Sequence, residues 1–324
     1  MKYEINQFTK LKLTTSVKLN YISVIIPVYN DARGLRDTLD SLQTQTLDKS
    51  QYELIVANDG GNEEITRLCR DYQVKIIEIK PNMGSYYARN RAIEISTGEY
   101  LVFTDADVKV PAHWLETGIK ALQEYDYAAA DISIDLSKVK TLTHFYDSNY
   151  TFQVRRFLEV AHFGPTANLF VKRRVFESIG GFDERLKSGG DLEFGNRVYT
   201  VTDFKQGYLK NNSIIHPPRG YKEYIKKLHR VSKGQQDLVC FYQSRFNYIK
   251  KTIPELLKEI ITPSARAKDL YCKPGNKYAY LTLFLFCWWI KALEYFLKIK
   301  YLYLLKPKMV GIKDCQITII RKEI

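Results

Sequence analysis

Two carboxylates, one residue apart, follow a short apolar stretch in the first third of the chain. Residues 100–104 are aromatic, aliphatic or β-branched, with Gly98 before them and Asp105-Ala-Asp107 after them. This pattern predicts a buried strand whose carboxyl end carries both carboxylates to a surface crevice. If the backbone stays extended, residues i and i+2 point the same way. Such a pair suits Mg²⁺ or Mn²⁺ bound together with phosphate groups, although Asp is also common in ordinary turns.

The composition is that of a globular protein with an excess of positive charge. The 324 residues are 45% hydrophobic and 26% charged, values that do not indicate disorder. This length fits one large α/β domain, or a domain of about 200 residues with an appendage. The net charge of +13 favours anionic partners, which include nucleotide phosphates, anionic lipid headgroups and nucleic acid, and it does not choose among them.

The cysteines and the N-terminal segment indicate a reducing compartment. The five cysteines are scattered, with no Cys-x-x-Cys pair, which argues against a disulfide framework and a structural zinc site. Residues 1–20 are polar and lack the apolar core of a signal peptide. We therefore expect a loosely held N-terminal extension and a cytoplasmic protein.

Strand and helix patterns alternate through the first 135 residues. This alternation predicts parallel β-α-β units in a doubly wound domain, in which ligands bind at the carboxyl ends of the strands. The predicted strands are 21–28, 53–57, 74–79, 100–104 and 127–134, and the predicted helices are 32–46, a segment after Asn62, and 85–95.

Single residues mark the expected starts and stops of these elements. Asn62 is expected to cap a helix that has two glutamates in its first turn. Ser85 would cap the helix that stops before Gly98. Pro111 would open a further helix, and Pro27 would end the ladder pairing of the first strand.

The chain becomes basic and aromatic beyond Gly220, after a less regular middle part. Residues 221–233 form a basic helix candidate, and 278–290 form an apolar run that is too short to span a bilayer. This run could lie at a membrane interface, or form a helical hairpin that packs on the main domain or on a second subunit. The middle part carries a helical, aromatic segment at 136–160, strands at 166–171 and 211–215, a short helix at 172–179, and a helix that starts near Asp191.

Five motifs occur in a characteristic order between residues 21 and 219. They are Ser-Val-Ile-Ile-Pro-Val-Tyr-Asn at 23–30, Val-Ala-Asn-Asp-Gly at 56–60, Asn-Met-Gly-Ser-Tyr-Tyr-Ala-Arg-Asn at 82–90, the stretch 98–107, and Gly-Gly-Phe-Asp-Glu at 180–184. In identity and order they resemble the motifs of family 2 glycosyltransferases. The resemblance implies a GT-A fold, which is an α/β fold with a mostly parallel sheet flanked by helices. The implied domains are an extension at 1–20, a catalytic domain at 21–219 and a helical C-terminal region at 220–324.

The resemblance also implies a nucleotide-sugar donor, a divalent metal and inversion at the anomeric carbon. Asp59 would read the edge of the base, although Asn58 stands where the family often has Asp. Asp107 would coordinate Mn²⁺ or Mg²⁺. His216 resembles the histidine that completes the metal site in some relatives, although an isolated His is often structural. The implied donor residues are Pro27, Tyr29, Asn30, Asn58, Asp59, Arg89, Asn90, Asp105 and Ala106, and the implied metal residues are Asp107, Asp105 and His216.

Asp191 matches the catalytic base of the family. An acceptor hydroxyl must lose its proton as it attacks, so a carboxylate is needed across the pocket from the metal. The family usually has Glu-Asp where this chain has Gly190-Asp191, which leaves the support of the base open. Asp191 could also serve only as a charge at the helix start. The residues assigned to the acceptor side are Thr166, Asn168, Gly190 and Glu193. Tyr146, Tyr150 and His162 are further aromatic candidates. For Glu193, the alternative is a simple i,i+4 pair with Arg197.

The leading hypothesis is an inverting, metal-dependent glycosyltransferase that uses a UDP-sugar. Its acceptor would be a saccharide or lipid-linked saccharide at the cytosolic face of a membrane, with peripheral contact to anionic lipid and with the C-terminal region as a surface for a homo-oligomer. Arg219 or nearby lysines would hold the diphosphate, or form a solvated basic face. The alternatives are a nucleotidyltransferase, which would need a glycine-rich basic loop after the first strand, and a nucleic-acid-binding protein, which the charge permits. We expect no nucleic-acid partner, and the sugar, acceptor and linkage stay open.

Overall fold

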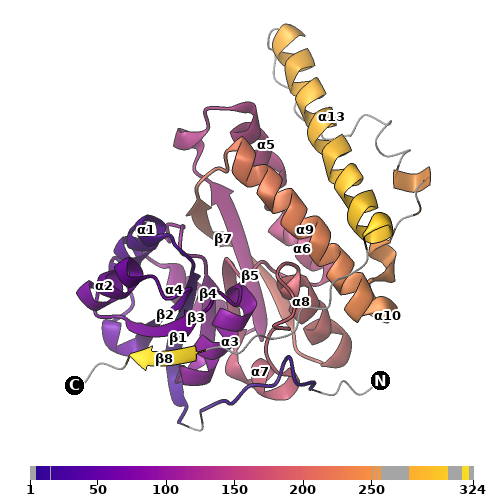
Figure 1. The fold of residues 1–324 in the computed structure, drawn as a ribbon. Coiled ribbons are helices and arrows are strands. Elements are labelled where there is room, and N and C mark those ends of the chain that lie inside the picture. Colours follow the sequence, from indigo (N-terminus) through magenta and orange to yellow (C-terminus); the bar gives the residue numbers. More distant parts are fainter. Residues whose placement is uncertain are drawn as a thin grey trace. The chain divides into compact units, whose positions relative to one another are not determined.

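The structure is a computed structural model that describes most of the chain (Figure 1). The described residues are 5–14, 16–250, 252, 254–256, 277–305 and 316–320, of which 277–281 and 316–320 are described by their backbone alone. They form two compact units. One unit contains the described residues within Met1–Asp135, Phe152–Pro217 and Gly311–Ile324, and the other those within Leu136–Thr151 and Pro218–Val310. The domain limits at residues 20 and 219 stay a prediction.

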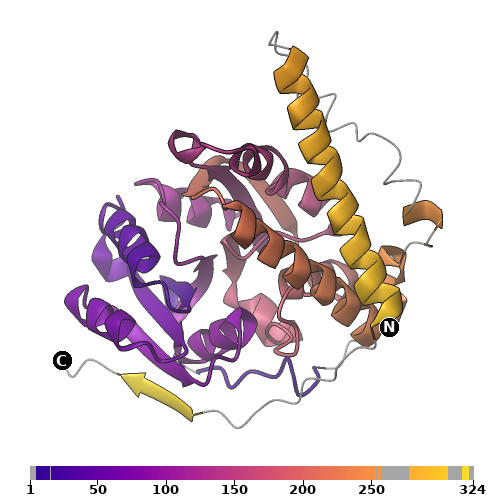
Figure 2. The same cartoon turned by 45° about the horizontal axis from the view of Figure 1, so that its top comes forward.

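The first unit is built on one eight-stranded sheet with the order β7-β5-β6-β4-β1-β2-β3-β8. The β1·β2, β2·β3, β1·β4 and β5·β7 pairs are parallel, whereas β6 and β8 run antiparallel to their neighbours. Figures 1 and 2 show β8 at the outer edge, next to β3. The strands are β1 (Lys18–Val28), β2 (Tyr52–Asp59), β3 (Lys75–Lys80), β4 (Gly98–Thr104), β5 (Tyr127–Ile134), β6 (Asn168–Lys172), β7 (Gln206–His216) and β8 (Gln316–Ile320).

The central strands are buried along nearly their whole length. Seven consecutive residues of β1 are buried, and β2 and β4 each contain one half-buried residue only. Continuous apolar burial, rather than alternation, is what parallel strands show when both faces of the sheet are covered. The helices of this unit are α1 (Ala32–Gln43), α2 (Glu63–Asp71), α3 (Ser85–Ile95), α4 (Trp114–Ala121), α6 (Val154–Ala161), α7 (Arg173–Ile179) and α8 (Gly190–Val201).

The N-terminal segment is held to the sheet unit, so the expected loose extension is wrong for its described residues. Thr9 is fully buried, and its carbonyl oxygen accepts a hydrogen bond from the Gly181 N–H at 2.7 Å. Strand β1 begins at Lys18, whose N–H donates to the Thr97 carbonyl at 2.8 Å. The partners lie far along the chain, so no local pattern in the sequence indicates them.

The predicted cap at Asn62 is confirmed, and two neighbouring predictions are wrong. The Asn62 side chain accepts hydrogen bonds from two backbone N–H groups in the first turn of α2. In α3, Gly84 with a φ of 98° takes the N-cap position, and Ser85 is the first helical residue. Gly98 does not stop α3 but opens β4, where a Cβ atom would lie 2.6 Å from the Ser23 nitrogen. Glycine is required there because the two strands approach closely.

Two proline predictions also need correction. Helix α4 does not open at Pro111 but begins three residues later, at Trp114. Pro27 stays in the ladder, where it pairs with Ala57 of β2, while the pairing of β1 with β4 ends before it. The missing N–H of proline therefore affects only one side of the strand.

The second unit is helical, as the sequence indicates for its residues within 136–151 and beyond 220. Both C-terminal helices are longer than the predicted 221–233 and 278–290, because each continues past the end of its clear pattern. Among the described residues, no helix is both long and apolar enough to cross a membrane. The core of the second unit is a buried cluster of Tyr146, Tyr224, Leu228, Cys287, Ile290 and Leu297. The elements are η2 (Leu136–Lys138), α5 (Leu142–Tyr150), α9 (Tyr221–Phe241), α10 (Gln243–Phe246), η3 (Asn247–Ile249), α13 (Lys277–Ile299) and the π-helical η4 (Lys300–Leu304).

Candidate functional site

The predicted donor and metal residues gather at one edge of the sheet. Asp59 ends β2, Asp105 and Asp107 follow β4, and His216 ends β7. Strands β2, β4 and β7 run in the same direction, so their carboxyl ends meet at this edge. That edge is where open α/β sheets bind ligands.

The two carboxylates after β4 have different partners. The chain turns at residues 106 and 107, so Asp105 and Asp107 do not project from one strand face, contrary to the extended backbone that we expected. Asp105 accepts a hydrogen bond from the buried Arg89 guanidinium, with 2.7 Å between Nη2 and Oδ1. Asp107 instead faces His216, with 3.5 Å between Oδ2 and Nε2. Only Asp107 is thereby placed to share a ligand with an imidazole.

The hydrogen bonding of His216 indicates which ring nitrogen faces Asp107 as an acceptor. Nδ1 lies 2.6 Å from the carbonyl oxygen of Pro217. Because a carbonyl can only accept, Nδ1 carries a proton, and in the neutral ring Nε2, on the side of Asp107, is then the atom that can bind a metal ion. Asp107 Oδ2 and an unprotonated His216 Nε2 can lie 3.5 Å apart without repulsion when a cation binds both atoms.

The donor set therefore fits a divalent cation with few protein ligands. Among the described residues, no three His, Cys, Asp or Glu side chains are grouped to hold a metal. A site of one carboxylate and one imidazole leaves coordination positions for phosphate oxygens and water, which Mg²⁺ and Mn²⁺ accept.

Asp59 organises the loop between β3 and α3. Its Oδ1 accepts from the Met83 N–H at 2.7 Å, and its Oδ2 accepts from the Gly84 N–H at 2.7 Å and from the Asn82 amide at 3.0 Å. Burial raises the pKa of Asp59, while these hydrogen bonds and the Lys187 charge act in the opposite direction. A carboxylate oxygen accepts about two hydrogen bonds, so Oδ1 keeps room for one more donor.

Tyr29 is exposed and lies against Gly60, the residue that follows Asp59. Its ring packs against Gly60, where a Cβ atom would come within 2.9 Å of the ring, and Gly60 has a φ of 139° that favours glycine. Asn30, with a φ of 51°, accepts a hydrogen bond from the Asn62 side chain at 3.1 Å. Pro27 belongs to β1 itself. The open aromatic face is thus provided by Tyr29.

Two asparagines predicted for the donor side have their hydrogen bonds inside the fold. Asn58 is fully buried and exchanges hydrogen bonds with the backbone of Asn62 at 2.9 and 3.1 Å. Asn90 is also fully buried and binds both backbone groups of Phe182, at 2.8 and 2.9 Å. These residues hold the chain that carries the site, because no polar atom of their amides faces solvent.

The predicted acceptor side is also mostly buried. Asn168 donates to the carbonyls of Asp131 and Asn212, both at 2.8 Å, and Thr166 is buried as well. Glu193 forms the i,i+4 pair with Arg197 that the sequence offered as the alternative, with 2.9 Å between Nη2 and Oε2. Of the weaker acceptor candidates, His162 stacks on Tyr199, and Tyr146 and Tyr150 belong to the second unit. Ala106, predicted for the donor side, has its carbonyl oxygen near Gly34.

Asp191 lies in the first turn of α8, behind Gly189 with a φ of 81°. Its Oδ1 accepts from the Tyr86 hydroxyl at 3.1 Å and from the Leu192 N–H at 3.0 Å. Burial raises the pKa of Asp191, although these hydrogen bonds and the charge of Arg89 oppose the shift. A carboxylate with a raised pKa is suited to proton transfer. Sequence reasoning missed Tyr86, although it lies three residues before Arg89 and hence on the same face of α3.

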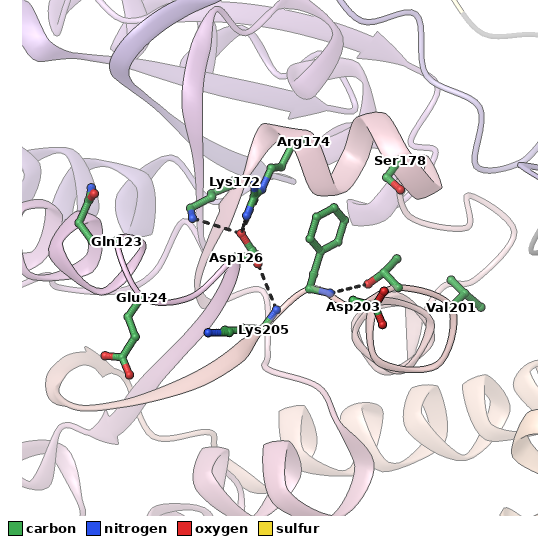
Figure 3. A pocket seen from close by; sticks show the side chains of 11 residues that line it. Gln123, Glu124, Asp126, Lys172, Arg174, Ser178, Val201, Asp203 and Lys205 are labelled. Atoms are coloured by element: carbon green, nitrogen blue, oxygen red, sulfur yellow. Dashed lines mark hydrogen bonds and ion pairs between the residues drawn. The ribbon is translucent and has the colours of Figure 1, made fainter.

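A separate hollow lies at the opposite edge of the sheet, where β5 and β7 begin (Figure 3). Its volume is about 640 Å³. Asp126 pairs there with Arg174 and with Lys172, at 3.1 Å from the latter, and accepts from the Lys205 N–H at 3.1 Å. The same hollow is lined by two further acids, so three bases meet three acids and no net charge selects an ion. The lining residues are Gln123, Glu124, Asp126, Lys172, Arg174, Ser178, Val201, Thr202, Asp203, Phe204 and Lys205.

Comparison with known proteins identifies the class. The profile of Glycosyl transferase family 2 matches residues 23–180. Glycosyltransferase AglE of Haloferax volcanii is 33% identical over 224 residues, which cover 67% of this chain and 73% of that protein. The chain therefore belongs to glycosyltransferase family 2. The minor teichoic acid biosynthesis protein GgaB of Bacillus subtilis is 27% identical over 78% of this chain and 29% of its own length.

Solved structures share the fold at low sequence identity. The mannosyltransferase PcManGT from Pyrobaculum calidifontis, in complex with GDP-Man and Mn²⁺, aligns with a TM-score of 0.61 at 17% identity over 88% of both chains. A fragment of S. aureus TarS in complex with UDP-GlcNAc aligns with a TM-score of 0.51 at 17% identity, over 87% of this chain and 91% of that one. The expected GT-A fold is confirmed. Membership of glycosyltransferase family 2 argues against the nucleotidyltransferase alternative.

Proposed function

We propose that the protein is an inverting, metal-dependent glycosyltransferase that moves a sugar from a UDP-sugar to a hydroxyl of a saccharide or lipid-linked saccharide. The observation that carries this proposal is the pairing of Asp107 with His216 at the same sheet edge as Asp59. A second carboxylate, Asp191, is linked to this edge through α3. The site thus offers a cation position and a separate proton acceptor.

The donor would bind along the edge formed by β1, β2 and β4. The free acceptor position on Asp59 Oδ1 suits the single N–H on the edge of a uracil base, and the exposed Tyr29 ring offers a face for stacking. Asp107 and His216 would hold Mn²⁺ or Mg²⁺. The bound cation would neutralise the charge that develops on the departing diphosphate. The solved neighbours that hold GDP-Man with Mn²⁺ and UDP-GlcNAc support a nucleotide-sugar donor of this kind.

Asp191 would take the proton from the acceptor hydroxyl. Its partners, the Tyr86 hydroxyl and the Leu192 N–H, both donate, so they stabilise the charged form that a general base needs. A single displacement with the base opposite the leaving group inverts the anomeric centre, and the proposal assigns the other described carboxylates of this edge to donor or metal binding instead of to a glycosyl intermediate. Asp59 and Asp105 already bind the 82–84 loop and Arg89.

On this proposal, the enzyme acts at the cytosolic face of a membrane, and its second unit makes a peripheral contact with the lipid. Its helix α13 exposes Leu285, Trp288, Trp289 and Phe296. Large aromatic side chains of this kind are enriched where a protein meets the lipid headgroup layer.

The test of the proposal is a donor screen followed by the Asp107→Ala variant. Hydrolysis and transfer are measured for a set of nucleotide sugars, with Mn²⁺ or Mg²⁺ added and with a chelator in excess. We expect a UDP-sugar to be used, metal to be required, and Asp107→Ala to lose on the order of 100-fold in rate or more.

The matched control is Asp37→Ala, which removes an exposed carboxylate on α1. It should keep the full rate and metal dependence. Full transfer by Asp107→Ala in the presence of chelator would contradict the metal dependence. Turnover of another nucleotide sugar, with none of any UDP-sugar, would contradict the UDP donor.

A further inference from the structure

Gly190, the residue before the proposed base, leaves space that an aromatic ring fills. A Cβ atom at position 190 would lie 2.7 Å from two ring carbons of Tyr86. Real Cβ atoms do not approach so closely, and both Gly190 and Tyr86 are buried. Glycine at 190 and tyrosine at 86 are therefore sterically matched, since any side chain at 190 must displace the ring.

The ring is fixed on its other sides and directs its hydroxyl at Asp191. Tyr86 is 6% exposed and lies 5.7 Å from the ring of Phe182, while the Arg89 guanidinium is 5.9 Å from its centroid. Its hydroxyl donates to Asp191 Oδ1 at 3.1 Å. The tyrosine thus has one orientation, in which its polar end meets one oxygen of the base.

We propose that Tyr86 is a positioning residue for the base: its hydroxyl orients the Asp191 carboxylate, and its ring takes the space that a side chain at position 190 would need. This inference rests on the proposed role of Asp191. On this inference, one face of α3 orients two carboxylates: Tyr86 binds Asp191, and Arg89 binds Asp105.

The contact has a definite effect on proton transfer. A hydroxyl that donates to a carboxylate favours its charged form and opposes the effect of burial. The other groups near Asp191 are the Leu192 N–H, the positive Arg89 and the buried Tyr127, whose own hydroxyl is bonded to the backbone of Gly164. Removal of the Tyr86 hydroxyl should raise the pKa of Asp191. Because a base acts when unprotonated, the acid limb of the pH–rate profile should then move to higher pH.

The first experiment compares Tyr86→Phe with the matched control Tyr87→Phe on the neighbouring position of α3. Phenylalanine keeps the ring and removes only the hydroxyl. For Tyr86→Phe we expect a rise of the acid limb by about one pH unit, so that kcat is about 10-fold lower at pH values below this limb, with UDP affinity by calorimetry within a few fold of the parent. Tyr87→Phe should leave the profile unchanged.

The second experiment tests the steric match by a double-mutant cycle. Gly190→Ala alone should lower kcat strongly, because the methyl group displaces the Tyr86 ring. In a Tyr86→Ser background the same change should cost little, so the two effects should be far from additive. Thermal unfolding of each variant checks that the fold is kept.

The outcomes separate this inference from the proposed function. An unchanged pH profile in Tyr86→Phe, or additive effects in the cycle, would overturn the role of Tyr86 even if Asp191→Asn is inactive. Normal transfer by Asp191→Asn would instead remove the base itself, and the proposed mechanism would fail with it.

Discussion

The acidic residues of the site differ in how their charge is balanced. Asp105 is neutralised by the buried Arg89, whereas Asp107 faces the imidazole of His216. Among the described residues, the hydrogen-bond donors to Asp191 are neutral, namely the Tyr86 hydroxyl and the Leu192 N–H, and the positive Arg89 acts on it without a direct hydrogen bond. A carboxylate without a direct cationic partner keeps a higher affinity for a proton, so Asp191 is the member of this set best suited to proton transfer.

Asp191→Asn should separate binding from chemistry. Asn keeps the size of the side chain, so the first turn of α8 should be preserved, but it cannot accept the proton of the attacking hydroxyl. Transfer should fall by about 10²–10⁴-fold, with UDP binding by calorimetry changed only a few fold. Glu193→Gln is the informative comparison, because Glu193 is fully buried against Arg197 and should affect stability more than chemistry. Loss of UDP binding in Asp191→Asn would make Asp191 a donor-site residue.

The sequence predicted which residues lie at the sheet edge better than it predicted their partners. Two of the five motifs place Asp59 and Asp107 at strand ends, and the predicted strand at 211–215 does the same for His216; strand ends meet by topology. The roles of Asn58 and Asn90 depend on hydrogen bonds to turns and loops, which the residue types alone do not specify. Tyr86 was missed because its partner, Asp191, lies 105 positions further along the chain.

At the scale of elements, local signals failed where packing between elements decides the residue. Asn62 caps α2 because an Asn side chain reaches its own helix start, a purely local interaction. Gly98 was misread as a helix stop because its requirement comes from the backbone of β1, seen only in the folded sheet. The same reasoning explains why the N-terminal segment, held by Gly181 and Thr97, was expected to be loose.

Helices α5 and α9 of the second unit share a buried ionic cluster. Asp147 is fully buried and accepts from the Arg219 N–H at 2.9 Å and from the Thr151 hydroxyl, with the Lys227 ammonium 3.7 Å away. Burial raises the pKa of Asp147, but the two cations and these hydrogen bonds together hold that pKa below its usual range. Burial lowers the pKa of Lys227 to about 7. The cluster therefore depends on the Asp147 charge more than on that of Lys227.

Asp147→Asn should destabilise the protein by about 1–3 kcal/mol at pH 7, because the partly buried Arg219 and Lys227 lose their counterion. A depressed pKa contributes stability above the unfolded-state pKa, and this contribution is lost as pH falls through the folded-state value. The difference between parent and variant should hence shrink below about pH 4. Urea unfolding as a function of pH measures it. Glu159→Gln, which breaks an exposed pair with Arg155, is the control and should cost less than about 1 kcal/mol. A pH-independent difference for Asp147→Asn would contradict the ionic explanation.

At the scale of the molecule, the second unit combines an apolar stripe with positive charge. Leu285, Trp288, Trp289 and Phe296 recur at helical spacing and are 42% to 58% exposed, while Cys287, Ile290 and Leu297 on another face of α13 are buried in the unit's core. The helix is apolar on both faces, which explains why the sequence could indicate its apolarity but not its function. Helix α9 exposes Lys222, Lys226 and Arg230 at four-residue intervals, and the whole chain carries a net charge of +13.

We expect this unit to bind vesicles that contain anionic lipid, with the aromatic residues of α13 in the headgroup layer and the basic residues attracted to the surface charge. Sedimentation with phosphatidylserine vesicles measures the binding. It should weaken as salt rises, because the electrostatic part is screened over about 10 Å at 0.1 M salt. The double change Trp288→Ala and Trp289→Ala should lower it about 10-fold or more, whereas Leu19→Ala, at an exposed apolar position of the sheet unit, should not. Binding that resists both high salt and carbonate extraction would contradict a peripheral contact. A concentration-dependent dimer that the tryptophan substitutions abolish, in the absence of vesicle binding, would assign the stripe to a second copy of the chain.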